Sequence, residues 1–197
     1  MLGIFLDIET TGLDATRHCP IDIAFKIIDL SSGFVLNEYQ SIVKQSMEAW
    51  QQRDHRSVEF NGFNYEAVAA GKDIGMINQE IVEIFSRLNI QRGNAFFICQ
   101  NPAFDRAFFN QLIDIYIQEG LRWPYHWLDL ASMYWAMCLS QARQGGRRAP
   151  EKISVSKNSI AQAFGLPPET CPHRAMRGVD HLLDCYKAVF GIEDWRS

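Results

Sequence analysis

The sequence predicts an α/β fold in which a mixed β-sheet is covered by helices. Three observations support this prediction. Apolar runs typical of strands come first, segments with helical spacing then alternate with short strand-like runs, and 47% of the 197 residues are hydrophobic. That length and composition are enough for one well-buried core, so we expect a single domain over residues 1–197.

The first half of the chain predicts three strands and one long helix. The opening segment, GIFLDIETTGL, is an apolar run that ends in a polar turn, as a buried strand does. Two further apolar runs, at 21–30 and 34–43, flank Ser31-Ser32-Gly33 and predict a hairpin. Residues 47–72 are polar and irregular, and apolar residues then recur at helical spacing over 74–88.

The second half of the chain predicts short strands alternating with helices. Residues 95–99 form an apolar run, and Asn101-Pro102 is typical of a helix start because proline costs little there. Residues 127–130 predict a strand before a helix through Arg143, and a polar loop follows at 144–150. Two shorter helices are expected at 156–164 and 175–190. The apolar stripe of the helix after residue 101 comprises Phe104, Phe108, Leu112, Ile115 and Tyr116.

Charge and composition exclude several classes of protein. A net charge of −4 and a pI near 5.7 argue against a protein that coats nucleic acid by bulk electrostatics, although a local site with metal ions can still hold a strand. No window approaches the roughly 18 apolar residues of a membrane span, and the run at 2–6 lacks the basic flank of a signal peptide. Five cysteines without a CxxC pair fit reduced thiols. We therefore expect a soluble, cytoplasmic protein without a membrane partner.

An acidic pair lies at the end of the first apolar run. Asp7 and Glu9 alternate along the predicted strand, so both carboxylates project from one face near its C-terminal end, where open α/β sheets usually bind ligands. Oxygen ligands this close together suit Mg²⁺ or Mn²⁺. The pair alone fits equally well with two acidic residues that simply meet solvent.

Three segments in order along the chain carry a more specific signal. They are LDIETTGL at 6–13, QNPAFDRAFF at 100–109 and CPHRAM at 171–176. Together they resemble the three motifs of the DEDDh branch of the DEDD superfamily of 3′-to-5′ exonucleases, which includes the proofreading subunit of bacterial DNA polymerase III, ribonuclease T and oligoribonuclease. The resemblance covers nearly the whole chain, including Asn61-Gly62-Phe63 and Trp127-Leu128-Asp129.

The resemblance implies a ribonuclease-H-like α/β fold, a mixed five-stranded sheet with helices on both faces. It implies two Mg²⁺ or Mn²⁺ ions held by Asp7, Glu9 and Asp105, with His173 as the general base that activates water. The implied reaction releases nucleoside 5′-monophosphates from nucleic-acid 3′ ends. Residues near the first two motifs are expected to contact the terminal sugar and base: Thr10, Thr11, Gly12, Asn101 and Phe104.

One position departs from the family pattern. The family places its fourth acidic residue five positions after the histidine, where this sequence has Gly178. Either that carboxylate is absent or Asp180 replaces it. An unbroken helix from Ala175 would turn Asp180 to the wet face, whereas Gly178 weakens a helix by roughly 1 kcal/mol and favours a later start. We predict a start near Asp180, with its carboxylate as a metal ligand. An unbroken helix would instead make Gly178→Asp the change that strengthens catalysis.

Two other clusters carry weaker signals. A dense basic stretch fits either contacts with backbone phosphates or a solvated surface loop; it comprises Arg143, Arg147, Arg148, Lys152 and Lys157. Four zinc-type ligands near the C-terminus do not follow a standard zinc spacing; they are Cys171, His173, His181 and Cys185.

The expected partner is a single-stranded 3′ end of DNA or RNA, and a DNA polymerase subunit is a second candidate. The rival interpretation is a catalytically weakened nucleic-acid-binding or polymerase-associated module of the same fold, which the glycine at position 178 favours. A metal-dependent nuclease assay discriminates between the two.

Overall fold

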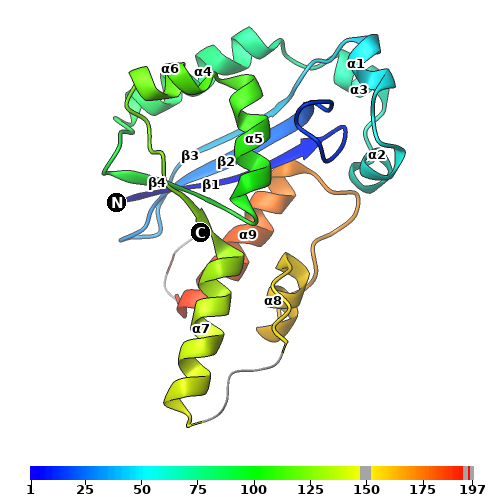
Figure 1. Ribbon diagram of the computed structural model, residues 1–197. Coiled ribbons are helices and arrows are strands. Elements are labelled where there is room, and N and C mark those ends of the chain that lie inside the picture. The colour runs from blue at the N-terminus through cyan, green and yellow to red at the C-terminus, as the bar shows by residue number, and fades with distance from the viewer. Residues whose placement is uncertain (147–151, 193–194, 196–197) are drawn as a thin grey trace.

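The computed structural model describes residues 1–146, 152–192 and 195, and it contains a mixed five-stranded sheet with the order β3-β2-β1-β4-β5 (Figure 1). β2 pairs antiparallel with both β1 and β3, and β4 pairs parallel with both β1 and β5. The strands are β1 (Leu2–Thr10), β2 (Pro20–Asp29), β3 (Val35–Ile42), β4 (Ala95–Cys99) and β5 (Trp127–Asp129). The predicted mixed sheet, including its N-terminal hairpin, is therefore confirmed.

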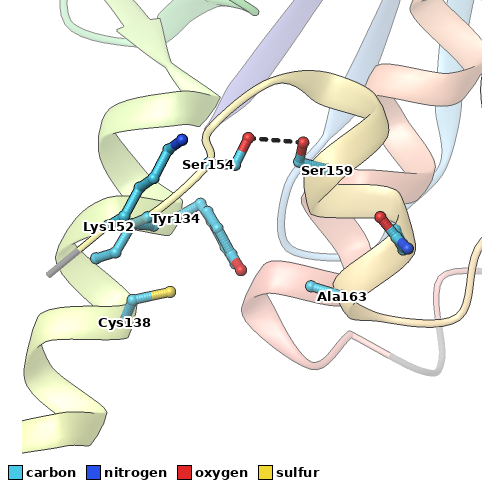
Figure 2. A pocket seen from close by; sticks show the side chains of 8 residues that line it. Tyr134, Cys138, Lys152, Ser154, Ser159 and Ala163 are labelled. Atoms are coloured by element: carbon cyan, nitrogen blue, oxygen red, sulfur yellow. Dashed lines mark hydrogen bonds between the residues drawn. The ribbon is translucent and has the colours of Figure 1, made fainter. Parts of the chain in front are cut away.

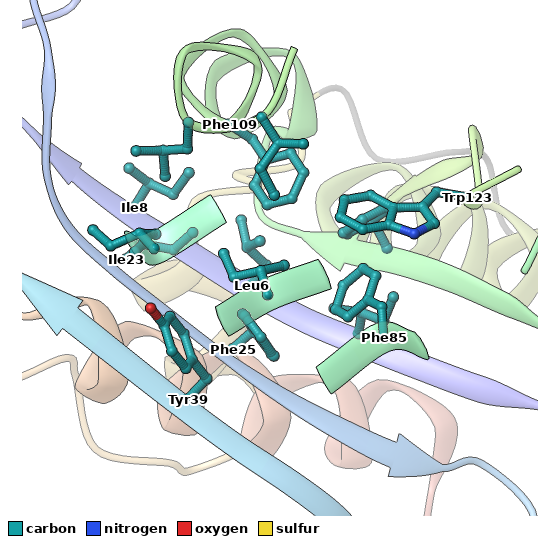
Figure 3. Packing of buried hydrophobic residues seen from close by; sticks show 14 of the residues in the cluster. Leu6, Ile8, Ile23, Phe25, Tyr39, Phe85, Phe109 and Trp123 are labelled. Carbon is teal, nitrogen blue, oxygen red and sulfur yellow. The ribbon is translucent and has the colours of Figure 1, made fainter. Parts of the chain in front are cut away.

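One face of the sheet is covered by α4 (Ile74–Arg87) and α5 (Pro102–Leu112). Leu6 and Ile8 of β1 point to this face and lie in one buried cluster with Phe85 of α4 and Phe109 of α5 (Figure 3). Trp123 closes the cluster, with its ring 4.6 Å from that of Phe85. Because side chains alternate along a strand, the odd-numbered residues of β1 face the opposite layer.

The opposite face is covered by α9 (Ala175–Phe190), with α7 (Leu130–Gln144) and α8 (Lys157–Ala163) beside it (Figure 1). Phe5 of β1 and Ala24 of β2 form a second buried cluster with Val179 and Leu182 of α9. The predicted covering of both faces is confirmed. Asp7 and Glu9 share the face of Phe5, so α9 and its neighbours enclose the acidic pair.

Residues 47–72 were expected to be irregular, but they form three short helices: α1 (Met47–Gln51), α2 (His55–Asn61) and α3 (Tyr65–Ala69). Each begins at a polar residue whose side chain accepts a backbone N–H, namely Ser46, Asp54 and Asn64. Helices of five to seven residues are too short to show an apolar period, so capping was the only signal in the sequence.

The helix of the second motif is shorter than predicted. α5 ends at Leu112, and α6 (Ile115–Gly120) starts again after Asp114, whose side chain accepts the N–H of Tyr116. Ile115 and Tyr116 are therefore exposed rather than part of the buried stripe.

Among the residues described, no helix combines the length and apolar character needed to cross a membrane. A cytoplasmic location stays a prediction.

Candidate active site

Asp7 and Glu9 lie at the C-terminal end of β1, on the side of the sheet that faces α9. Ile8 between them is buried on the other side, which follows from the alternation of the strand. β4 runs parallel to β1, so both strands end at the same edge of the sheet. The helix that follows β4 therefore begins beside the acidic pair.

Asp105 reaches the pair from the first turn of that helix. The backbone of Asn101 is left-handed, with a φ of 59°, and Pro102 then occupies the first turn of α5. The Asp105 side chain is buried, with 4% of the residue exposed, and the negative charge of Asp7 acts on it strongly. The structure thus brings together the three carboxylates that the sequence predicted as metal ligands.

Burial raises the pKa of all three carboxyl groups. It raises the pKa of Glu9 to about 8, and the neighbouring charges of Asp7 and Glu169 add to the effect. The pKa of Asp105 is raised well above its ordinary value by burial and then by Asp7. For Asp7, burial raises the pKa even though the ammonium of Lys157 lowers it. Repelling carboxylates in a dry position favour the approach of a cation.

His173 lies in the segment between α8 and α9. Its backbone N–H donates to the carbonyl of Phe60 at 3.1 Å, and the two rings meet edge to face at 6.0 Å. Its Nδ1 lies 3.5 Å from Oε1 of Glu169. Glu169 also pairs with Lys157, whose ammonium lies beside Asp7, so His173 lies next to the group of charged side chains around Asp7. Its role as the general base stays a prediction.

The turn after Glu9 is held from inside the protein. The hydroxyl of Thr10 donates to the carbonyl of Gly12 at 2.7 Å, and Thr11 Oγ1 accepts the N–H of Cys19 at 2.9 Å. Both threonine side chains are buried. Asn61, from the predicted Asn-Gly-Phe segment, donates its side-chain N–H to the carbonyl of Thr10 at 3.0 Å. The predicted substrate contacts of Thr10, Thr11 and Gly12 stay predictions, because these groups already bond within the turn.

The other two predicted substrate contacts lie at the edge of the site. Asn101 is exposed, and Phe104 is half-buried against the ring of Phe108 at 4.9 Å. Near His173, a hollow with a volume of about 560 Å³ is lined by Glu59, Phe60, Cys171 and Pro172. An exposed aromatic ring therefore lies next to the predicted general base.

The prediction for Asp180 is wrong. α9 begins at Ala175 and runs unbroken through Gly178, because Asp22 of β2 accepts the N–H of Ala175 at 3.0 Å and fixes the start of the helix. The apolar contacts of α9 with the sheet outweigh the weak helix propensity of Gly178. The Asp180 side chain is 52% exposed, and its Oδ1 lies 2.7 Å from Nζ of Lys26.

The sequence analysis did not predict that three further charged residues lie at the candidate site. Asp22 is buried opposite Glu9 in the β1–β2 register and holds the N-terminus of α9. Lys157 places its ammonium 3.4 Å from Oδ1 of Asp7 and 2.8 Å from Oε2 of Glu169. Lys157 was visible only as part of a basic stretch, and Glu169 had no signal because it lies in an irregular segment.

Lys152, another residue of the basic stretch, lies away from the carboxylates. Lys152 is exposed at a hollow of about 360 Å³ between α7 and α8, beside Tyr134 and Cys138 (Figure 2). Arg147 and Arg148 lie outside the described residues. Of the zinc-type set, Cys171 is exposed, whereas Cys185 is buried with its thiol 3.8 Å from the carbonyl of Lys157.

Comparison with solved structures shows the fold. Exonuclease I of E. coli, in a zinc-bound complex with single-stranded DNA, superposes with a TM-score of 0.74 at 18% identity over 98% of this chain. The cell-death related nuclease CRN-4 gives a TM-score of 0.70 at 13% identity, also over 98% of this chain and over 65% of its own. This chain spans 41% of the exonuclease I chain. No family model and no curated protein matches the sequence. The predicted resemblance is thus confirmed at the level of the fold, which is that of these nucleases.

Proposed function

We propose that this chain is a divalent-metal-dependent 3′-to-5′ exonuclease of the DEDDh branch, with residues 1–197 as one exonuclease domain. It releases nucleoside 5′-monophosphates from single-stranded DNA or RNA. The observation that carries the proposal is the convergence of Asp7, Glu9, Asp105 and His173 at one end of the sheet. The fold shared with exonuclease I, whose structure holds single-stranded DNA, supports it.

The donor set fits a hard divalent cation. Asp7, Glu9 and Asp105 offer carboxylate oxygens, which Mg²⁺ and Mn²⁺ prefer. Burial, together with repulsion from neighbouring carboxylates, raises the pKa of each of the three groups. Within residues 1–146, 152–192 and 195, no three His, Cys, Asp or Glu side chains already stand as a complete set of ligands. A divalent ion held by Asp7, Glu9 and Asp105 would polarise the scissile phosphate and lower the pKa of the attacking water.

His173 takes the proton of that water. Its Nδ1 lies beside Glu169, which leaves Nε2 as the proton acceptor. The water oxygen forms a bond to phosphorus, the bond from phosphorus to the 3′ oxygen breaks, and that oxygen takes a proton from solvent water. The terminal nucleotide departs with its 5′ phosphate. The remaining strand ends in a new 3′ hydroxyl group.

The nucleic-acid strand lies along the side of the site where His173 and Phe60 meet. Phe60 is 64% exposed beside the hollow at Cys171 and Pro172, and an exposed aromatic ring can stack on any base. Asn101 and Phe104 contact the terminal nucleotide from the start of α5, the helix that also carries Asp105. Such stacking does not depend on sequence, which suits an enzyme that trims any 3′ end.

The test is digestion of end-labelled single-stranded DNA and RNA with Mg²⁺ or Mn²⁺, followed by identification of the products. We expect nucleoside 5′-monophosphates released stepwise from the 3′ end, and no release by folded Asp7→Ala. The matched control is Asp73→Ala, which removes an exposed aspartate before α4 that makes no side-chain capping bond. Stepwise release by Asp7→Ala would sink the site assignment. Strand binding without any release by the wild type would favour the weakened binding module.

A further inference from the structure

Gly178 stands where the exonuclease family carries its fourth acidic residue. In this chain the space that a side chain at position 178 would occupy is taken by Asp7 of β1. A Cβ atom at Gly178 would lie 2.2 Å from Oδ2 of Asp7 and 2.5 Å from its Cγ. The carboxylate of Asp7 therefore leans into the space of the absent side chain. Gly178→Asp alone cannot restore the family pattern, because Asp7 would first have to move.

Lys157 enters the same space from α8. Its ammonium lies 3.4 Å from Asp7 Oδ1 and 3.4 Å from the carbonyl of Gly178, and its side chain is only 12% exposed. The segment before it is held to the end of β4, since Gln100 donates to the carbonyl of Val155 at 2.7 Å. The carboxylates of Asp7 and Glu169 both lie within ion-pairing distance of Nζ of Lys157, and a lysine side chain is protonated at neutral pH. The ammonium is thus charged.

Glu169 is the second carboxylate that pairs with Lys157. Its side chain is 4% exposed, and its Oε2 lies 2.8 Å from Nζ of Lys157. Asn158 accepts the backbone N–H of Glu169 at 2.9 Å, which keeps the residue against α8. Its other oxygen, Oε1, is buried and has no hydrogen-bond partner among the residues that the structure describes. This oxygen is aimed into the cluster beside His173.

We propose that Lys157 takes the place of one of the two divalent ions, so that this chain binds one divalent ion, held by Asp7, Glu9 and Asp105. The ammonium supplies positive charge between Asp7 and Glu169, where the resemblance implies a second ion near the absent fourth carboxylate. A second dication there would meet a fixed positive charge in a dry position, where repulsion is poorly screened. The chemistry rests on the proposed function, but the number of ions does not require substrate to be measured.

The test is to count Mn²⁺ ions bound by the folded full chain without nucleic acid, from the electron paramagnetic resonance signal of free Mn²⁺. We expect one ion for the wild type and two for Lys157→Met, because the freed carboxylates of Asp7 and Glu169 then attract another cation. Adding Glu169→Gln to Lys157→Met should return the count to one. The matched control is Lys152→Met, which removes an exposed lysine of the same segment and should leave one ion.

Each outcome decides the matter. Two ions on the wild type, or one on folded Lys157→Met, overturns the inference and leaves the proposed exonuclease in place. No ion on the wild type overturns both the inference and the metal dependence. One ion without nuclease activity supports the inference and rejects the proposed function. If Lys157→Met fails to fold in a circular dichroism check, the wild-type count and Lys157→Gln still decide.

Discussion

The two halves of the candidate site differ in how they are built. The acidic half stands on β1 and α5, where Asp7, Glu9 and Asp105 hold positions fixed by the strand alternation and the first helical turn. The other half, which we call the basic half after Lys157, is built from α8 and from the irregular segment before α9. There Lys157 and Glu169 meet each other and Asp7 only through tertiary contacts.

This difference shows which part of the site can vary without changing the fold. The acidic half shares its elements with the core, since β1 and α5 carry Ile8 and Phe108 of the main buried cluster. The basic half lies at the edge of the second cluster, where Lys157 is the first residue of a short helix. On our proposal, the charge of Lys157 in the basic half takes the place of an ion beside the carboxylate that is absent at position 178.

His173→Ala tests whether the segment before α9 contributes to the chemistry. We expect turnover to fall by roughly 10² to 10⁴, the usual contribution of a general base. Bound Mn²⁺ should be retained, because the carboxylates of β1 and α5 are untouched. The measurements are single-strand digestion and Mn²⁺ binding. His55→Ala, at an exposed position of α2, is the matched control, and an equal loss in both variants would contradict the role of His173.

Gly178→Ala tests the contact between the halves. The added methyl group would occupy the position of the Asp7 carboxylate, so that carboxylate must turn away from α9 and Lys157. We expect turnover to fall by about tenfold, which corresponds to about 1.4 kcal/mol in the activation free energy. Thermal unfolding should change little, because alanine also favours the helix. Gly75→Ala is the control, since nothing lies within 4 Å of its Cβ position in α4. Full activity of Gly178→Ala would show that Asp7 works in another position.

The same contrast explains how much the sequence could predict. Apolar runs and helical spacing predicted all five strands and the apolar faces of α4 and α9, because each of these signals lies within one element. Motif order predicted Asp7, Glu9 and Asp105 as neighbours, since β1 and β4 end at one edge. The start of α9 was misjudged because Asp22, distant in sequence, caps it. The ion pair of Lys157 and Glu169 likewise depends on packing that no local pattern records.

Glu9→Gln tests the repulsion within the acidic half through pH. The pKa of Glu9 is raised from 4.5 to about 8, so the metal-free folded protein binds this proton more tightly than the unfolded chain. The stability that Glu9 contributes is fully present below pH 4.5 and is lost as the pH rises towards 8. Glutamine stays neutral, so the free energy of unfolding of the variant should rise by about 2 kcal/mol relative to the wild type as the pH increases from 4.5 to 8. This is less than the full pKa shift would give, because neighbouring carboxyl groups share protons with Glu9.

Denaturant unfolding of both proteins with EDTA at pH 5 and pH 8 measures this difference. Adding Mn²⁺ at pH 8 should stabilise the wild type more than Glu9→Gln, because the ion replaces the proton only where a carboxylate is present. Curves for the two proteins that stay parallel across this pH range would show that Glu9 is not under strain from its neighbours.

Asp180→Asn should have the smallest effect of these substitutions. It distinguishes the two alternatives that the sequence left open at Gly178: the fourth carboxylate is absent, or Asp180 replaces it. Asp180 is half-exposed and pairs with Lys26, which Glu38 also contacts at 3.1 Å. Exposed ion pairs contribute about 0–1 kcal/mol, so the free energy of unfolding should fall by less than about 1 kcal/mol. The Mn²⁺ concentration for half-maximal activity should stay unchanged, whereas Asp105→Asn should raise it because a buried ligand is lost. A rise with Asp180→Asn as large as that with Asp105→Asn would mean that α9 opens in solution and delivers Asp180 to the carboxylates. An unchanged Mn²⁺ requirement would mean that Asp180 is not a metal ligand. Lys157 and Glu169 then remain the charged groups that occupy the region of the missing carboxylate at Gly178.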